Sequence, residues 1–351
     1  TMPLTSNTLL HARYRIRAPI GKGGMGAVYL AEDTQSPGRL VAVKEMTPLP
    51  GSSESALAQA RQQFQREAQV LARLQHPNLP RVTDTFTQDD KEYLVMDYVA
   101  GRSLSEFLHQ TGTSLPEPQV LSWARQILDV LVYLHGHSVI HRDIKPGNIR
   151  LTPEGRAVLV DFGLVKLFDP RDPRTVTFMR GLGTAAYAPL EQSDQGIGYP
   201  VKPGLGTDAR ADIYSLGATL YHLLTGQAPP TAALRALEPG LLVSPRQLNP
   251  ALSERTERVV LTALALHPNQ RFQSAAEMRE ALAGRWPLPA LEAPTVPLER
   301  PRAGGGQATW WLAAGLVAVV VVTLVGTLGI GGALLGASTS RPPSSSNPPV
   351  R

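Results

Sequence analysis

The sequence predicts an α+β fold for most of the chain, followed by a disordered linker and one membrane-spanning helix. Three observations lead to this prediction. Residues 14–283 alternate between strand-like and helix-like hydrophobic periods. Residues 284–309 are rich in Pro, Gly and Ala and cannot bury enough apolar surface to fold. Residues 310–335 are apolar and uncharged over more than the roughly 20 residues that cross a bilayer core.

Composition limits the kinds of function that the chain can have. Its 351 residues suit one large domain with extra segments, and its 42% hydrophobic content allows a sizeable core. The chain has no cysteine, which excludes disulfides, zinc–thiolate sites and iron–sulfur clusters. Its net charge of +5 comes without the clustered basic and aromatic residues of a nucleic-acid surface, so we expect no nucleic-acid partner. Residues 1–17 lack the apolar core of a signal peptide.

A glycine-rich segment opens the α+β region. The run from Ile20 to Val28 reads G-x-G-x-x-G-x-V. Glycines let a backbone approach phosphates closely because no Cβ stands in the way. A dinucleotide-binding turn shares these glycines but opens a helix. Here strand-like residues follow, and a turn at residues 36–38 leads to a strand that ends in Lys44. The pattern therefore favours a glycine hairpin over the turn of a dinucleotide-dependent oxidoreductase.

Two further segments complete the first part of the α+β region. Residues 56–74 have a hydrophobic period near 3.6, which predicts an amphipathic helix, and Glu67 lies on it. Residues 93–99 read as an apolar strand that runs into a linker, with Met96 near its end.

The strongest signal lies further along the chain. Residues 141–148 read H-R-D-x-K-P-x-N, and an Asp-Phe-Gly triplet begins at Asp161, thirteen residues after Asn148. Together with the glycine hairpin and Lys44, in this order and at these spacings, the motifs resemble those of eukaryotic-type (Hanks-type) serine/threonine protein kinases. Bacteria contain such kinases as single-span membrane proteins. The resemblance implies a two-lobed kinase fold, with a small β-rich N-lobe over about residues 14–98 and a larger α-helical C-lobe over about residues 99–283.

The resemblance also implies roles for the matched residues in phosphoryl transfer. Asp143 would act as the catalytic base, and Lys145 would contact the transferred phosphate. Lys44 would reach the α- and β-phosphates of ATP, held there by an ion pair with Glu67. The residues that would bind ATP are Ile20, Gly21, Lys22, Gly23, Gly24, Met25, Gly26, Ala27, Val28, Lys44, Asp97 and Val99.

A metal ion is the expected cofactor of the same site. Asn148 and Asp161 would bind Mg²⁺, with Mn²⁺ as an alternative, because these ions prefer carboxylate and carbonyl oxygens together with phosphate. The alternative is that these residues only stabilise loops and helix caps. Against it, both occur at the expected spacing from Lys44 and the glycine hairpin.

The expected activation segment runs from Asp161 to Glu191. Thr175 and Thr177 lie in its polar, Arg-flanked part, and we expect autophosphorylation at one or both. The alternative is that both are ordinary loop threonines. The segment ends in A-P-L-E, which departs from the family's A-P-E by an added leucine and makes the alignment there less certain. Structural roles fall to Arg142, which would pair with a phosphothreonine, and to Glu191, Asp212 and Arg271.

The apolar run at residues 310–335 predicts a transmembrane helix. Two tryptophans open it, at a position where indole rings favour the membrane interface. A buried helix is the alternative, but only the short polar tail at residues 336–351 follows, and we expect that tail to be extracytoplasmic. Glycines in the second half of the span would allow a homodimer, or are loose helix-end residues. Positive charges flank both ends and leave the orientation open.

These features predict a membrane-anchored serine/threonine protein kinase that transfers the γ-phosphoryl group of ATP to protein substrates. ATP is cytoplasmic, so we expect the kinase domain on the cytoplasmic face of the cell membrane. The alternative from another class is a pseudokinase that acts as a nucleotide-sensing scaffold. A pseudokinase would lack the equivalent of Lys44, Asp143 or Asp161, and all three are present.

Overall fold

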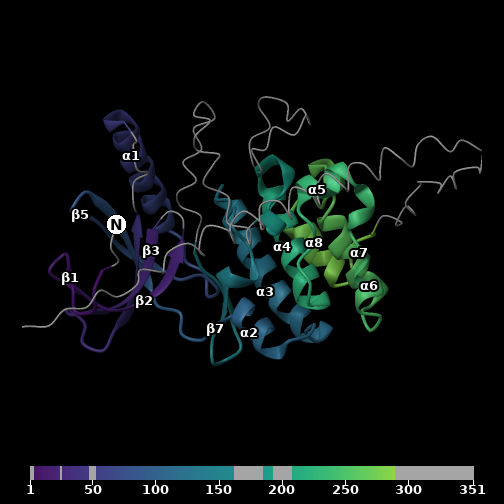
Figure 1. The fold of residues 1–351 in the computed structure, drawn as a ribbon, viewed down its shortest axis with the longest axis horizontal. Helices are drawn as coiled ribbons and strands as arrows, with labels where there is room; N and C mark the ends of the chain where they lie inside the picture. The colour runs from purple at the N-terminus through teal and green to yellow at the C-terminus, as the bar shows by residue number, and fades with distance from the viewer. Residues whose placement is uncertain (1–3, 24–25, 47–52, 162–184, 193–207, 289–351) are drawn as a thin grey trace, which may run out of the picture. The chain divides into compact units, whose positions relative to one another are not determined.

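The computed structural model describes residues 4–23, 26–46, 53–161, 185–192 and 208–288 (Figure 1). The chain divides into two units, Thr1–Leu291 and Glu292–Arg351, and all described residues belong to the first. That unit begins with a β-sheet and continues mainly as helices. The predicted two-lobed α+β fold is therefore confirmed.

The N-lobe is a six-stranded antiparallel sheet with one helix. The strand order is β1-β2-β3-β4-β6-β5. Its elements are β1 (Leu9–Leu10), β2 (Tyr14–Gly23), β3 (Gly26–Asp33), β4 (Leu40–Met46), α1 (Glu54–Leu71), β5 (Val82–Gln88) and β6 (Lys91–Asp97).

The side-chain alternation of β4 assigns a face of the sheet to α1. Val41 and Val43 are buried in one apolar cluster on the first face. Ala42 and Met46 lie on the opposite face, in the cluster that also contains Phe64 of α1. Alternate residues of a strand share a face, so Lys44 points toward the face that α1 covers.

Two N-lobe boundaries differ from the sequence-based expectation. Strand β1 precedes the predicted start at residue 14, and Leu10 within it is buried. Helix α1 ends at Leu71 rather than at residue 74. There the amides of Arg73 and Leu74 bond to carbonyls three residues back, at 3.1 and 3.0 Å. Such bonds tighten and end the last turn of a helix.

The C-lobe is helical and contains one small antiparallel sheet, in the order β7-β8-β9. Its strands and α-helices are β7 (Arg102–Ser103), α2 (Leu104–Thr111), α3 (Glu117–Gly136), β8 (Ile149–Leu151), β9 (Ala157–Leu159), α4 (Ala209–Thr225), α5 (Ala232–Leu237), α6 (Pro245–Leu248), α7 (Glu254–Ala263) and α8 (Ala275–Leu282). Its short 3₁₀ helices are η1 (Pro146–Asn148), η3 (Ala185–Tyr187), η4 (Leu190–Gln192), η5 (Pro239–Leu241) and η6 (Pro268–Gln270).

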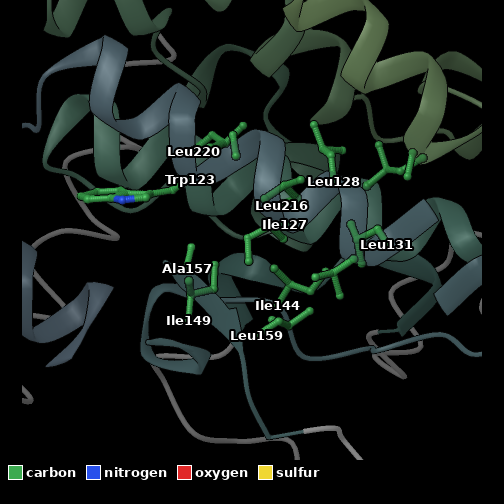
Figure 2. Packing of buried hydrophobic residues seen from close by; sticks show 14 of the residues in the cluster. Trp123, Ile127, Leu128, Leu131, Ile144, Ile149, Ala157, Leu159, Leu216 and Leu220 are labelled. Atoms are coloured by element: carbon green, nitrogen blue, oxygen red, sulfur yellow. The ribbon is translucent and has the colours of Figure 1, made fainter. Parts of the chain in front are cut away.

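Helices α3 and α4 form the centre of the C-lobe. Figure 2 shows Ile127 and Leu131 of α3 near Leu216 of α4, with residues of β8 and β9 close by. Helix α4 is buried on all sides from Ala211 to Leu220. A helix surrounded in this way is buried on every face. The catalytic loop, residues 141–148, is hydrogen-bonded to it through Asp212.

The segments predicted to follow the kinase domain lie outside the described residues, apart from the first part of the linker, up to Leu288. They are the rest of the linker, the span at residues 310–335 and the tail at residues 336–351. Within the described ranges, no helix combines the length and apolar character that crossing a bilayer requires. The membrane span therefore remains a prediction.

Candidate active site

Strands β2 and β3 form the glycine hairpin. Gly21 pairs with Val28 and Gly23 pairs with Gly26 across the hairpin. Gly26 has φ of 148°, and a Cβ there would lie 1.8 Å from the carbonyl oxygen of Glu45. Only glycine fits at this position, so the hairpin can lie close against β4. Ala27 and Val28 are half-buried, and Ile20 is exposed.

Not every predicted residue of the hairpin is described. Gly24 and Met25 at its tip lie outside the described residues, as does the side chain of Lys22. Their predicted contact with ATP remains a prediction.

Lys44 lies beneath the hairpin. It is paired with Val28 of β3 and with Leu94 of β6, and its side chain is 15% exposed. Its Nζ forms an ion pair with the carboxylate of Asp161. The structure thus brings together a lysine of the N-lobe and the predicted metal ligand of the C-lobe. Glu67 lies on α1, but its side chain is outside the described residues, so its pair with Lys44 remains a prediction.

The catalytic loop gathers Asp143, Lys145 and Asn148 within hydrogen-bonding distance. Lys145 Nζ lies 2.9 and 3.1 Å from the two carboxylate oxygens of Asp143. Asn148 Nδ2 donates to the same carboxylate at 2.9 Å and to the backbone carbonyl of Asp143 at 2.8 Å. These bonds fix the orientation of the Asp143 carboxylate, as a base that must meet a substrate hydroxyl requires.

The oxygen set of the site fits a magnesium ion. The Nδ2 of Asn148 is committed to Asp143, while its side-chain oxygen accepts no hydrogen bond from the described residues. The amide of Val160 donates to the backbone carbonyl of Asn148 at 2.8 Å, which places the adjoining Asp161 beside it. Mg²⁺ is usually bound by one or two side-chain oxygens plus phosphates. Asn148 and Asp161 would hold such an ion, which would neutralise negative charge on the phosphate oxygens.

Buried Asp212 of α4 holds the backbone of the catalytic loop. Its carboxylate, which is fully buried, accepts from the amide of His141 at 2.9 Å and from the amide of Arg142 at 2.8 Å. His135 Nε2 lies 2.9 Å from the same carboxylate. Arg142 has φ of 67°, a conformation that non-glycine residues adopt only when their surroundings enforce it. The Asp212 bonds supply that enforcement.

Two other residues of the loop region are held in unusual states. The ring of His141 is buried, and burial lowers the pKa of this histidine below its ordinary value. The buried ring also accepts a hydrogen bond at Nδ1 from the amide of Asp143, at 3.4 Å. Asp161 has φ of 62°, which again indicates a backbone held by its neighbours next to the chemistry.

The end of the activation segment is clamped to the C-lobe by an ion pair. Arg271, whose side chain is fully buried, lies 2.5 and 3.1 Å from the two Glu191 oxygens. It also donates to the carbonyls of Ala265 and Leu266 at 2.8 and 2.9 Å. The added residue Leu190 therefore does not displace Glu191 from Arg271. Thr175 and Thr177, the predicted phosphorylation sites, lie outside the described residues.

Asp97 at the end of β6 and Val99 just after it are the predicted ATP-binding residues of the segment that joins the lobes. Met96 is buried behind it. The amide of Asp97 donates to the carbonyl of Arg81 at 3.0 Å, and its carboxylate binds Arg39 at 3.0 Å. Among the described residues, the amide of Val99 has no acceptor. Both the amide and the carboxylate of Asp97 are therefore already bonded within the protein, while Val99 offers a hydrogen-bond donor.

Sequence reasoning missed two contacts at this site. Tyr187 Oη lies 2.7 Å from His222 Nδ1 of α4, and burial raises the pKa of Tyr187 to about 12. This contact adds a second anchor for residues 185–192. Arg150 of β8 donates to the carbonyl of Val99 at 3.0 Å. The only indication of the Arg150 contact in the sequence is that an arginine lies between the apolar residues Ile149 and Leu151, two positions after Asn148.

The fold and the arrangement of these residues define a protein kinase domain. Comparison with known families agrees: the model of the protein kinase domain matches residues 14–283. The chain belongs to the protein kinase family, and its relatives identify it as a Hanks-type serine/threonine member.

The relatives are bacterial kinases. A probable serine/threonine-protein kinase of Streptomyces coelicolor is 37% identical over 282 residues, which cover 77% of this chain and 39% of that protein. Serine/threonine-protein kinase PknA of Nostoc is 36% identical, over 84% of this chain and 50% of that protein. The crystal structure of the Mycobacterium tuberculosis PknI kinase domain shares 29% identity, with a TM-score of 0.62, over 81% of this chain and 100% of that domain. The chain thus spans about half the length of its curated relatives, or less.

Proposed function

We propose that the protein is a membrane-anchored kinase that transfers the γ-phosphoryl group of ATP to serine or threonine side chains of protein substrates. The observation that carries the proposal is the cluster of Asp143, Lys145 and Asn148 on one lobe, joined to the other lobe by the Lys44–Asp161 ion pair. A pseudokinase would be expected to lack part of this set.

In this proposal each residue of the cluster has a task. Asp143 accepts the proton of the substrate hydroxyl and orients its oxygen toward the phosphorus. Lys145, bound to the same carboxylate, would contact the transferred phosphoryl oxygens. Lys44, on the strand next to the glycine hairpin, would contact the α- and β-phosphates. Catalysis then rests on positioning and charge neutralisation, since phosphoryl transfer needs little covalent chemistry from the protein.

The test of activity is phosphate transfer from radiolabelled ATP to a generic basic protein, with Mg²⁺ or Mn²⁺ present. The matched control is Asp143→Asn, which preserves the shape of the side chain and removes its charge. Equal transfer by both proteins would refute the kinase and leave the scaffold. Phosphoamino-acid analysis of the product should show phosphoserine or phosphothreonine.

Autophosphorylation of the activation segment is the second part of the proposal. Arg142 next to Asp143 would pair with the phosphate of Thr175 or Thr177 and order the segment. Mass spectrometry after incubation with Mg-ATP should find phosphate at one of these threonines. If active enzyme also phosphorylates the Asp143→Asn protein, the reaction occurs in trans. Absence of phosphate throughout residues 166–180 would contradict this part.

Membrane anchoring is the third part, and it is supported by the length and apolar character of residues 310–335. The kinase domain would then be cytoplasmic and attached to one span, which would also mediate a homodimer. The full chain should stay in the membrane fraction after an alkaline wash. Replacement of three central valines by arginine should release it, whereas replacement by leucine should not.

A further inference from the structure

Arg150 lies on the strand that leaves the metal-binding end of the catalytic loop. Strand β8 begins directly after Asn148, and the side chain of Ile149 is buried among apolar residues of the C-lobe core, with α3 nearby (Figure 2). Neighbouring residues of a strand point to opposite faces. Arg150 therefore faces away from that core. Its partners across the small sheet are Ser103 of β7 and Val158 of β9.

The guanidinium of Arg150 reaches the segment that joins the two lobes. Its Nε donates to the carbonyl of Val99 at 3.0 Å, and its Nη2 donates to the carbonyl of Gly101. Hydrogen bonds from a charged donor are stronger than neutral ones, and a guanidinium presents its donors in a fixed plane. Two such bonds from one side chain hold both peptide groups in one orientation.

The same segment is pressed closely against β8. Gly101 has φ of 112°, and a Cβ at that position would lie 1.9 Å from the carbonyl oxygen of Leu151. The joining segment therefore has little freedom to move away from β8 at Gly101. At Val99 the Arg150 side chain is the hydrogen-bond partner of the carbonyl, while the half-buried amide of Val99 has no acceptor among the described residues.

Charge around Arg150 favours this arrangement. Glu106 at the start of α2 is bound to the amide and hydroxyl of Ser103 at 2.7 and 2.9 Å. These bonds, with a contribution from Arg150, lower the pKa of Glu106 and keep it ionised. A carboxylate near the guanidinium offsets part of its desolvation cost.

We propose that Arg150 is a positioning residue for nucleotide binding, which fixes the Val99 backbone so that its amide can donate to the purine ring. This rests on the proposed ATP-dependent activity. Strand β8 would then contribute to binding at both ends of the nucleotide. Asn148, directly before the strand, would bind the metal at the phosphates, and Arg150 within the strand would position the backbone that binds the purine.

The test compares Arg150→Met with Arg156→Met in the full chain. Met keeps the apolar stem of Arg150 and removes its donors. Exposed Arg156 is a matched control, because it also donates to a carbonyl, that of Pro77 at 3.2 Å, and not to the carbonyl of Val99. Arg150→Met should raise KM for ATP about tenfold with kcat within about twofold, and leave KM for the protein substrate unchanged. Arg156→Met should change none of these values, and Arg150→Lys should restore part of the ATP affinity.

Binding of adenosine, measured by calorimetry, distinguishes the base site from the phosphate site. Adenosine has no phosphate, so a defect at the Val99 amide should weaken its binding as much as that of ATP. Unchanged adenosine affinity would overturn the proposal, whether or not KM for ATP changes. If Arg150→Met has a melting temperature well below that of Arg156→Met, its loss of stability would obscure the result. The adenosine affinity of the Arg150→Lys protein, measured by calorimetry, then tests the proposal instead. If the wild-type protein binds adenosine but transfers no phosphate, the proposed function fails while the role of Arg150 is still tested.

Discussion

The two sides of the active site are held in different ways. On the C-lobe side, buried charged groups fix the backbone: Asp212 binds two successive amides of the catalytic loop, and Arg271 binds Glu191 and three carbonyls. On the N-lobe side, Lys44 lies on a paired strand and forms an ion pair with Asp161, whose side chain is 40% exposed. The charged groups that hold the C-lobe side are therefore more deeply buried than the Lys44–Asp161 pair that joins the two lobes.

The largest effect is expected for Asp143→Asn, which tests catalysis separately from the stability of either side of the active site. Asp143→Asn should lower phosphate transfer by about 10²–10⁴-fold, because general-base catalysis contributes that much. The melting temperature should stay near that of the wild type, since the amide can still accept from Lys145 and Asn148. A comparable loss of stability would mean that Asp143 supports the loop rather than acts on the substrate.

Breaking the C-lobe side should destabilise the fold. Arg271→Met leaves the carboxylate of Glu191 unpaired at a site where it is 10% exposed, and should cost about 3–5 kcal/mol of unfolding free energy. The matched control is Arg279→Met, whose pair with Asp129 is 37% and 50% exposed, with an expected cost of at most about 1 kcal/mol. Urea denaturation of both variants measures the difference, and equal costs would contradict the comparison.

Breaking the N-lobe side should leave the fold intact. Lys44→Met should reduce kcat/KM by about 10²–10³-fold, the usual effect of removing one electrostatic contact to the reacting groups. Its unfolding free energy should match that of Arg15→Met, a change at an exposed position of β2 in the same sheet. A large loss of stability in Lys44→Met alone would show that the Lys44–Asp161 pair is structural.

The smallest expected effect is a pH dependence of the C-lobe. Burial lowers the pKa of His141, against the opposing effect of Asp212 and the other nearby carboxylates. The unfolded chain therefore takes up a proton below the ordinary histidine pKa while the folded chain does not. Stability should fall as the pH drops from 7 to 5.5, by at most about 1.4 kcal/mol per pH unit for this group. In His141→Phe the slope should be smaller, and an unchanged slope would assign it to other histidines.

The sequence predicted the fold class because motif order and spacing were preserved over residues 14–283. The motifs also led to Asp143 and Asp161, which the structure places in contact with Lys145 and Lys44, and their roles in phosphoryl transfer stay predictions. The sequence did not predict β1, which has only two residues. Nor did it predict that Lys44 pairs with Asp161, because a lysine can reach more than one carboxylate and only the fold decides which is near.

Arg150 illustrates the other limit of sequence reasoning. An arginine on a short strand is usually a solvated side chain. Its significance depends on the carbonyl of Val99, which lies 51 positions earlier in the chain. No local pattern contains that contact.

The side chain of Asn148 has two different ends, and both are used. Its nitrogen donates twice to Asp143, while its oxygen is left for a metal. An aspartate would have the same shape but no donor, and it would place two carboxylates within about 3 Å of each other, where one must take up a proton. A protonated group at either position would weaken the base or the metal site. Position 148 therefore requires an amide, and an extra negative charge there would weaken magnesium binding rather than strengthen it.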